Sequence, residues 1–209
     1  MKTYLTVWTL VLLIATGLVI ISEFVSADVR PLMMAEGGWV EDASWMAYFL
    51  AAFLVLLTTF RHPTRWCMIV GVMLFGLREL DCDKRFTTMG MFKSRYYFSS
   101  EVPVGEKIIA GLVTAAIVAV LFYLVKFHLK PFFRRVMKRE GASLSFFFAG
   151  GLMVFTKTID GFSRKLEPFG IVPSDAIKQL VESVEECFEL AAAVFVLVAA
   201  MGALRHRSK

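Results

Sequence analysis

The residues best suited to chemistry form one charged segment, Arg78-Glu79-Leu80-Asp81-Cys82-Asp83-Lys84-Arg85. It follows directly on an apolar run from Trp66 to Leu77, so its first charges lie where a hydrophobic helix should still be inside lipid. A charged side chain at that depth costs roughly 2.5–3.5 kcal/mol on insertion scales, so it usually faces a partner or a water-filled cavity. The segment therefore predicts a polar site within a membrane protein.

Four glutamates near the C-terminus supply a second charged pattern. They are Glu182, Glu185, Glu186 and Glu189. Because a helix turns by about 100° per residue, this spacing places all four on one face. Ser174, which follows Pro173, is a suitable N-cap for the helix that carries them.

A third pattern, Lys157, Asp160 and Arg164, forms a similar stripe if its helix continues through Gly161. Cations on one helix that oppose carboxylates on another would form ion pairs across the bundle. We therefore expect Lys157 to pair with Glu189 or Glu186. We expect Arg164 to pair with Glu182 or Glu185.

The composition predicts an integral membrane protein. The 209 residues are 57% hydrophobic and 20% charged, with a mean hydropathy of +0.66, too apolar for a soluble domain. The basic residues lie in short segments between apolar runs, which argues against a nucleic-acid partner. The three cysteines lack C-x-x-C spacing and the three histidines lie near predicted helix ends, so we predict no metal site and no particular cofactor.

Six apolar runs predict an all-α bundle of about six transmembrane helices, forming a single domain over residues 1–209. Each run is near the roughly 20 residues that cross a bilayer core, and only helices satisfy the backbone there. The predicted spans are 5–21, 44–60, 66–80, 108–127, 142–159 and 187–204. The first run, with Val25-Ser26-Ala27 after it, also resembles a signal peptide; its length favours a retained anchor helix.

The basic residues orient the predicted bundle. With the N-terminus inside, the inner side holds 12 basic residues and the single acid Glu140, and the outer side 11 basic and 17 acidic residues. The positive-inside rule then predicts that both termini are cytoplasmic. The inner loop 126–139 is basic enough to bind anionic lipids.

Depth estimates place the charged patterns in one layer. From the helical rise, Arg78 lies about 18 Å above Trp66, and Lys157 about 22 Å above Ala142. Glu189 lies about 22 Å above Leu204 on the last span. We therefore predict one polar pocket in the outer half of the membrane, whose residues are Arg78, Glu79, Asp81, Lys157, Asp160, Arg164, Glu182, Glu185, Glu186 and Glu189.

Further charges would form the rim of this pocket: Glu36, Glu41, Lys84 and Arg85. The pocket has seven acids and three bases, an excess that protons or a bound cation must balance. The alternative is a structural ion-pair network with solvated outer carboxylates. The long outer loop from Cys82 to Pro103 mixes aromatic and basic residues, which fits lipid headgroups or a lid over the pocket.

Three motifs carry a resemblance. They are Glu36-Gly37-Gly38-x-x-Glu41, Arg78-Glu79-x-Asp81-x-x-Lys84-Arg85-Phe86 and Glu185-Glu186-x-x-Glu189. The chain resembles uncharacterised, polytopic bacterial inner-membrane proteins, which implies a multi-pass protein of that membrane and no particular activity. It departs from membrane ceramidase-like hydrolases, because its outer half lacks the histidines they use for zinc.

Three functions are compatible with these patterns. Titratable groups inside a helical bundle favour proton- or cation-coupled transport. Carboxylates could instead serve a membrane enzyme that acts on a lipid or lipid-linked substrate, although no nucleophile is evident, so we assign no catalytic residue and leave open whether the protein is an enzyme. The third alternative is an accessory subunit whose polar layer binds a partner's transmembrane segment. Besides the bilayer, the partners expected are therefore a protein or a small cationic ligand.

Overall fold

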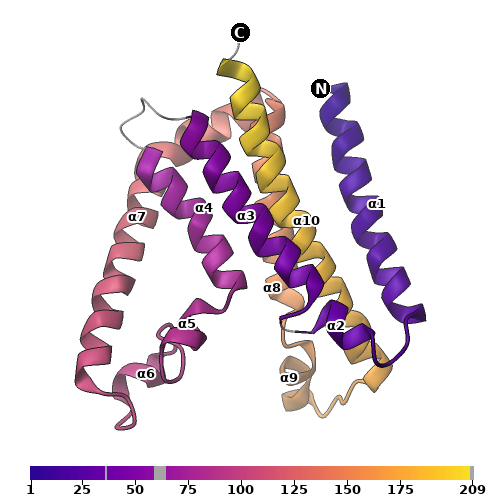
Figure 1. The fold of residues 1–209 in the computed structure, drawn as a ribbon, viewed down its shortest axis with the longest axis vertical. Coiled ribbons are helices and arrows are strands. Elements are labelled where there is room, and N and C mark those ends of the chain that lie inside the picture. Colours follow the sequence, from indigo (N-terminus) through magenta and orange to yellow (C-terminus); the bar gives the residue numbers. More distant parts are fainter. Residues whose placement is uncertain (36, 59–64, 208–209) are drawn as a thin grey trace.

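A computed structural model describes residues 1–35, 37–58 and 65–207, and these residues form helices and connections without a strand. The six long helices are α1 (Lys2–Phe24), α3 (Trp39–Thr58), α4 (Arg65–Glu79), α7 (Val104–Met137), α8 (Gly141–Ile159) and α10 (Asp175–Arg207). The short ones are α2 (Arg30–Met34), α5 (Cys82–Phe86), α6 (Ser94–Phe98), α9 (Phe162–Leu166) and the 3-10 helix η1 (Glu167–Phe169). The N- and C-termini lie at the same end of the bundle (Figure 1).

Among the described residues, five segments are long and apolar enough to cross a membrane. They comprise α1, α2 with α3, α7, α8 and α10 up to Leu204. The predicted third span, 66–80, is also helical, but α4 has only 15 residues, a length of about 22 Å against a hydrocarbon core of about 30 Å. The all-helical, membrane-type architecture is confirmed, whereas α4 falls outside the five candidate spans.

Several helix boundaries follow the predicted ones. Helix α8 begins one residue before its predicted start, and α10 begins directly after Ser174. The Ile177 backbone N–H donates to Ser174 Oγ at 3.4 Å, so the predicted N-cap is confirmed. Helix α7 continues to Met137, ten residues beyond its predicted end, because basic residues that leave the apolar layer remain compatible with a helix.

Helix α10 lies at the centre of the bundle and packs chiefly against α8 and α3, with α1 along a further side (Figure 1). Three consecutive alanines on it, Ala191, Ala192 and Ala193, are fully buried. Small side chains allow helix backbones to approach closely, which a membrane interior requires because lipid supplies no hydrophobic drive for association. The alanine run therefore places α10 at the centre.

Helix α1 packs as a member of this bundle. Its Trp8 indole Nε1 donates to Ser145 Oγ of α8 at 2.8 Å, and both side chains are buried. At its other end, Glu23 pairs with Arg30 at 2.8 Å, and Arg30 also donates to Ser183 Oγ of α10 at 3.0 Å. Polar contacts thus fix both ends of α1.

Helix α7 lies at the periphery. It stands apart from the central helices over much of its length, and α5 and α6 lie beside the end farthest from the chain termini (Figure 1). Only Ala110 of its described residues is buried. Its apolar surface therefore faces the surroundings on nearly every side.

Candidate buried charge cluster

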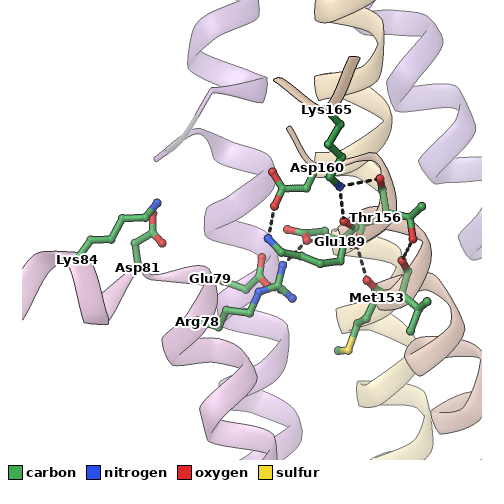
Figure 2. Close-up of polar contacts among 12 residues, drawn as sticks. Arg78, Glu79, Asp81, Lys84, Met153, Thr156, Asp160, Lys165 and Glu189 are labelled. Atoms are coloured by element: carbon green, nitrogen blue, oxygen red, sulfur yellow. Dashed lines mark hydrogen bonds and ion pairs between the residues drawn. The ribbon is translucent and has the colours of Figure 1, made fainter. Parts of the chain in front are cut away.

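An ion pair between an exposed arginine and buried carboxylates joins α4 to α10. The guanidinium Nη2 of Arg78 donates to Glu189 Oε1, and Nη1 lies 3.7 Å from Glu79 Oε1 (Figure 2). Glu79 and Glu189 are only 7% and 9% exposed. One cation at the end of α4 thus lies between two buried carboxylates.

Two neutral side chains complete the surroundings of this pair. Thr156 on α8 is fully buried, and its Oγ1 donates to Glu189 Oε1 at 3.2 Å. Tyr48 on α3 is buried against Phe75, with ring centroids 5.7 Å apart, and lies close enough to Glu79 to interact electrostatically. Four helices, α3, α4, α8 and α10, therefore surround the cluster.

More carboxylates than cations act at this point. Glu186 interacts electrostatically with Glu79 and with Glu189. Glu41 interacts electrostatically with Glu79 and with Glu186. Glu41 Oε2 also accepts the Gly37 backbone N–H. Carboxylates from α3, α4 and α10 thus lie near the guanidinium of Arg78.

The predicted pairing of Lys157 with Glu189 or Glu186 is wrong. Lys157 Nζ pairs with Asp160 of the same chain segment, and its side chain is 64% exposed. Thr156, which contacts Glu189, directly precedes Lys157, so the Lys157 side chain lies about 100° around α8 from that contact. The cation that pairs with Glu189 is Arg78 rather than Lys157.

The predicted stripe along the fifth helix is interrupted. Helix α8 ends at Ile159, and Gly161 adopts a left-handed conformation, with φ +62°, that reverses the chain before α9. Asp160 thus lies at the helix end. A hydrogen bond from the Lys157 ammonium, with the charges of Lys165 and Arg164 adding to it, lowers the pKa of the Asp160 carboxyl.

Arg164, Glu182 and Glu185 meet at the surface. They line an open hollow of about 250 Å³ between α9 and α10, together with Lys178. Glu185 is one turn from Glu189 and interacts electrostatically with it. The structure thus brings Arg164 near the expected glutamates, at a hollow rather than inside the cluster.

The remaining predicted residues lie elsewhere. Asp81 pairs with Lys84 at 2.6 Å, and in Figure 2 both side chains point away from Arg78 and Glu189. Arg85 is exposed on α5. Glu36 lies outside the described residues.

The excess of carboxylates in the cluster favours uptake of positive charge, most simply a proton. Within residues 1–35, 37–58 and 65–207, no three His, Cys, Asp or Glu side chains come close enough together to hold a metal ion. Two buried carboxylates beside one guanidinium carry a net negative charge when both are ionised, and burial makes such a charge costly. The chemistry available here is therefore uptake and release of positive charge.

Tyr48 and Thr156 were not predicted as parts of the site. Both are uncharged, and a hydroxyl inside an apolar helix gives no distinct sequence signal. Thr156 directly precedes Lys157 in the sequence. Considering the polar residues on either side of Lys157 would therefore have included it. Tyr48 lies on a span for which no polar role was considered.

The chain was compared with known proteins by sequence and by structure. No model of a protein family, no curated protein and no solved structure matches it.

Proposed function

We propose that the protein spans the bacterial inner membrane six times, with both termini in the cytoplasm. The common end of the two termini in Figure 1 supports this topology, as does the excess of basic residues on that side. Helix α4 would be the sixth span. Because α4 is short, its last residues, Arg78 and Glu79, would lie within the membrane rather than above it.

The proposed molecular function is proton- or cation-coupled transport through the buried charge cluster. The observation that carries it is the pair of nine-tenths-buried carboxylates, Glu79 and Glu189, beside the one guanidinium of Arg78. A proton shared by the two carboxylates, or a small cation between them, would balance the cluster. Release of that charge leaves both carboxylates competing for Arg78.

One side of the cluster is exposed, which supports exchange of a proton or cation with the surroundings. The Arg78 side chain is 40% exposed, although its two partners are buried. Glu185 and Glu182 continue from Glu189 along α10 to the open hollow at the helix surface. We therefore expect charge to enter from the side of the membrane away from the two termini.

Proton flux into sealed liposomes tests this function. The purified protein is reconstituted with an internal pH-sensitive dye, and an imposed pH or potassium gradient drives the flux. Glu79→Gln and Glu189→Gln keep size and hydrogen bonding but cannot titrate, so each should abolish the flux. Glu140→Gln, at the opposite end of the bundle, is the matched control and should leave it intact. Flux that is equal in all three variants would contradict the proposal.

The peripheral position of α7 favours a second candidate, an accessory subunit. Its exposed apolar surface could contact a partner's transmembrane segment, as could the small residues Gly111 and Ala115. Photo-cross-linking from Leu112 in native membranes would detect such a partner, with Leu10 on α1 as a comparison. A discrete adduct from Leu112 alone would support this candidate, and lipid adducts from both positions would oppose it.

A further inference from the structure

The connection between α4 and α7 contains α5 and α6 and carries both exposed phenylalanines and basic residues on its surface. Phe86, Phe92 and Phe98 are 82%, 59% and 89% exposed. Large exposed aromatic side chains are unfavourable in water, and a group of them on one short segment is typical of a binding surface. This surface therefore requires an apolar partner.

The segment is held in a fixed shape. Glu106 near the start of α7 accepts the Thr88 backbone N–H at 2.8 Å and the Tyr96 hydroxyl at 3.0 Å. Tyr96 is fully buried, and the Lys107 ammonium donates to the Ser99 carbonyl at 2.7 Å. These contacts tie the segment to α7. The phenylalanines are thus exposed by an ordered framework.

The charge on the surface is predominantly positive. Arg85, Lys93 and Arg95 are exposed, and Lys84 is engaged by Asp81. Aromatic residues mixed with Lys and Arg are typical of segments at a membrane interface, because the rings enter the acyl region while the cations remain among phosphates. Hydrogen bonds from Thr88 and Tyr96 to Glu106 hold the segment beside the exposed apolar exterior of α7.

We propose that the α5–α6 segment is a lipid-binding surface that fixes this end of α7 in the membrane. Phe86, Phe92 and Phe98 insert among the acyl chains of one leaflet. Arg85, Lys93 and Arg95 bind the phosphate groups of the lipids above them. The occupant is phospholipid, and this role does not depend on what the buried charge cluster does.

Depth-dependent fluorescence quenching tests the insertion. The three native cysteines are replaced by serine, and an environment-sensitive fluorophore is attached at Phe92→Cys or Phe98→Cys in liposomes that contain lipids with a quencher on the acyl chain. Asp28→Cys, exposed at the same end of the bundle, is the control. We expect several-fold stronger quenching at residues 92 and 98 than at residue 28. Equal quenching at all three positions would overturn the proposal.

Lipid composition and charge variants test the phosphate contacts. Quenching in phosphatidylcholine liposomes would show that the basic residues bind the phosphate common to all phospholipids. Quenching only with added phosphatidylglycerol would show that they require anionic headgroups. Either result supports the proposal. Replacing Arg85 and Arg95 together by glutamine should weaken quenching at residue 98. If quenching persists unchanged in this doubly substituted protein, the phosphate role is wrong. Elution as a single species in detergent serves as the folding control.

Discussion

Helices α10 and α7 are almost equal in length, at 33 and 34 residues, and both are apolar enough to span a membrane, but their environments differ sharply. In the most apolar stretch of α10, 50% of the residues are buried, against 6% in α7. Helix α10 carries a run of alanines and one charged residue, Glu189, inside that stretch, whereas the charges of α7 lie towards its two ends. A continuous alanine run and a buried glutamate, rather than overall hydropathy, thus distinguish the central helix α10 from the peripheral helix α7.

The largest effect should come from removing the cation that faces α10. Arg78→Leu leaves Glu79 and Glu189 without their cation, and breaking a buried pair typically costs about 3–5 kcal/mol. Because the Arg78 side chain is 40% exposed, we expect about 3 kcal/mol lower stability. Unfolding in mixed micelles with increasing SDS would measure it.

The matched control is Arg134→Leu at the exposed end of α7, which should change the free energy of unfolding little. A double-mutant cycle sharpens the assignment. Arg78 and Glu189 should couple, and Lys157 and Glu189 should be additive. Coupling of Lys157 with Glu189 instead would show that the structure pairs the wrong cation.

A smaller effect is expected from enlarging the alanine face of α10. Ala192 is fully buried, so Ala192→Leu forces extra volume between packed helices, at a cost of about 1–3 kcal/mol. Ala116→Leu in α7 adds the same atoms at an exposed position and should be nearly neutral. Thermal aggregation of the two variants in detergent would compare them. Equal loss of stability would mean that α7 is packed as tightly as α10.

The smallest effect should come from the exposed pair at the end of α8. Lys157→Ala should cost less than about 1 kcal/mol, as exposed ion pairs do. Lys157 lowers the pKa of the Asp160 carboxyl in the folded state below its ordinary value of 3.8. The pair therefore stabilises the folded state fully at a pH above 3.8. This contribution is lost as the pH falls through the lowered folded-state pKa. Wild type and variant should therefore converge in acid. A difference that instead grows below pH 3.8 would contradict this assignment.

Hydrophobic runs and capping residues predicted most of the helices because both signals are local. The run that became α8 and the Ser174 cap of α10 were found within one residue. The end of α7 was missed because basic residues stop an apolar run without stopping a helix. The interruption at Gly161 was left open, since glycine permits a reversal but does not require one.

The charge cluster was predicted only in part. Helical rise correctly gave a shared depth to Arg78 and Glu189, but depth does not specify which way a side chain faces. The contact between them depends on the rotation of α4 and α10 about their axes, which packing against α3 and α8 determines. That is why Lys157, at the right depth, faces outward while Thr156 faces Glu189.

Infrared spectroscopy as a function of pH tests the central claim most directly, since protonated carboxyl groups absorb where ionised ones do not. The protein in lipid should show a protonated-carboxyl band that changes with pH and is lost in Glu79→Gln or Glu189→Gln. It should persist in Glu140→Gln. If added Na⁺ or K⁺ removes the band in the wild type, the bound charge is a cation that competes with the proton. A spectrum identical in the wild type and in both cluster variants, at every pH and salt tested, would contradict the account.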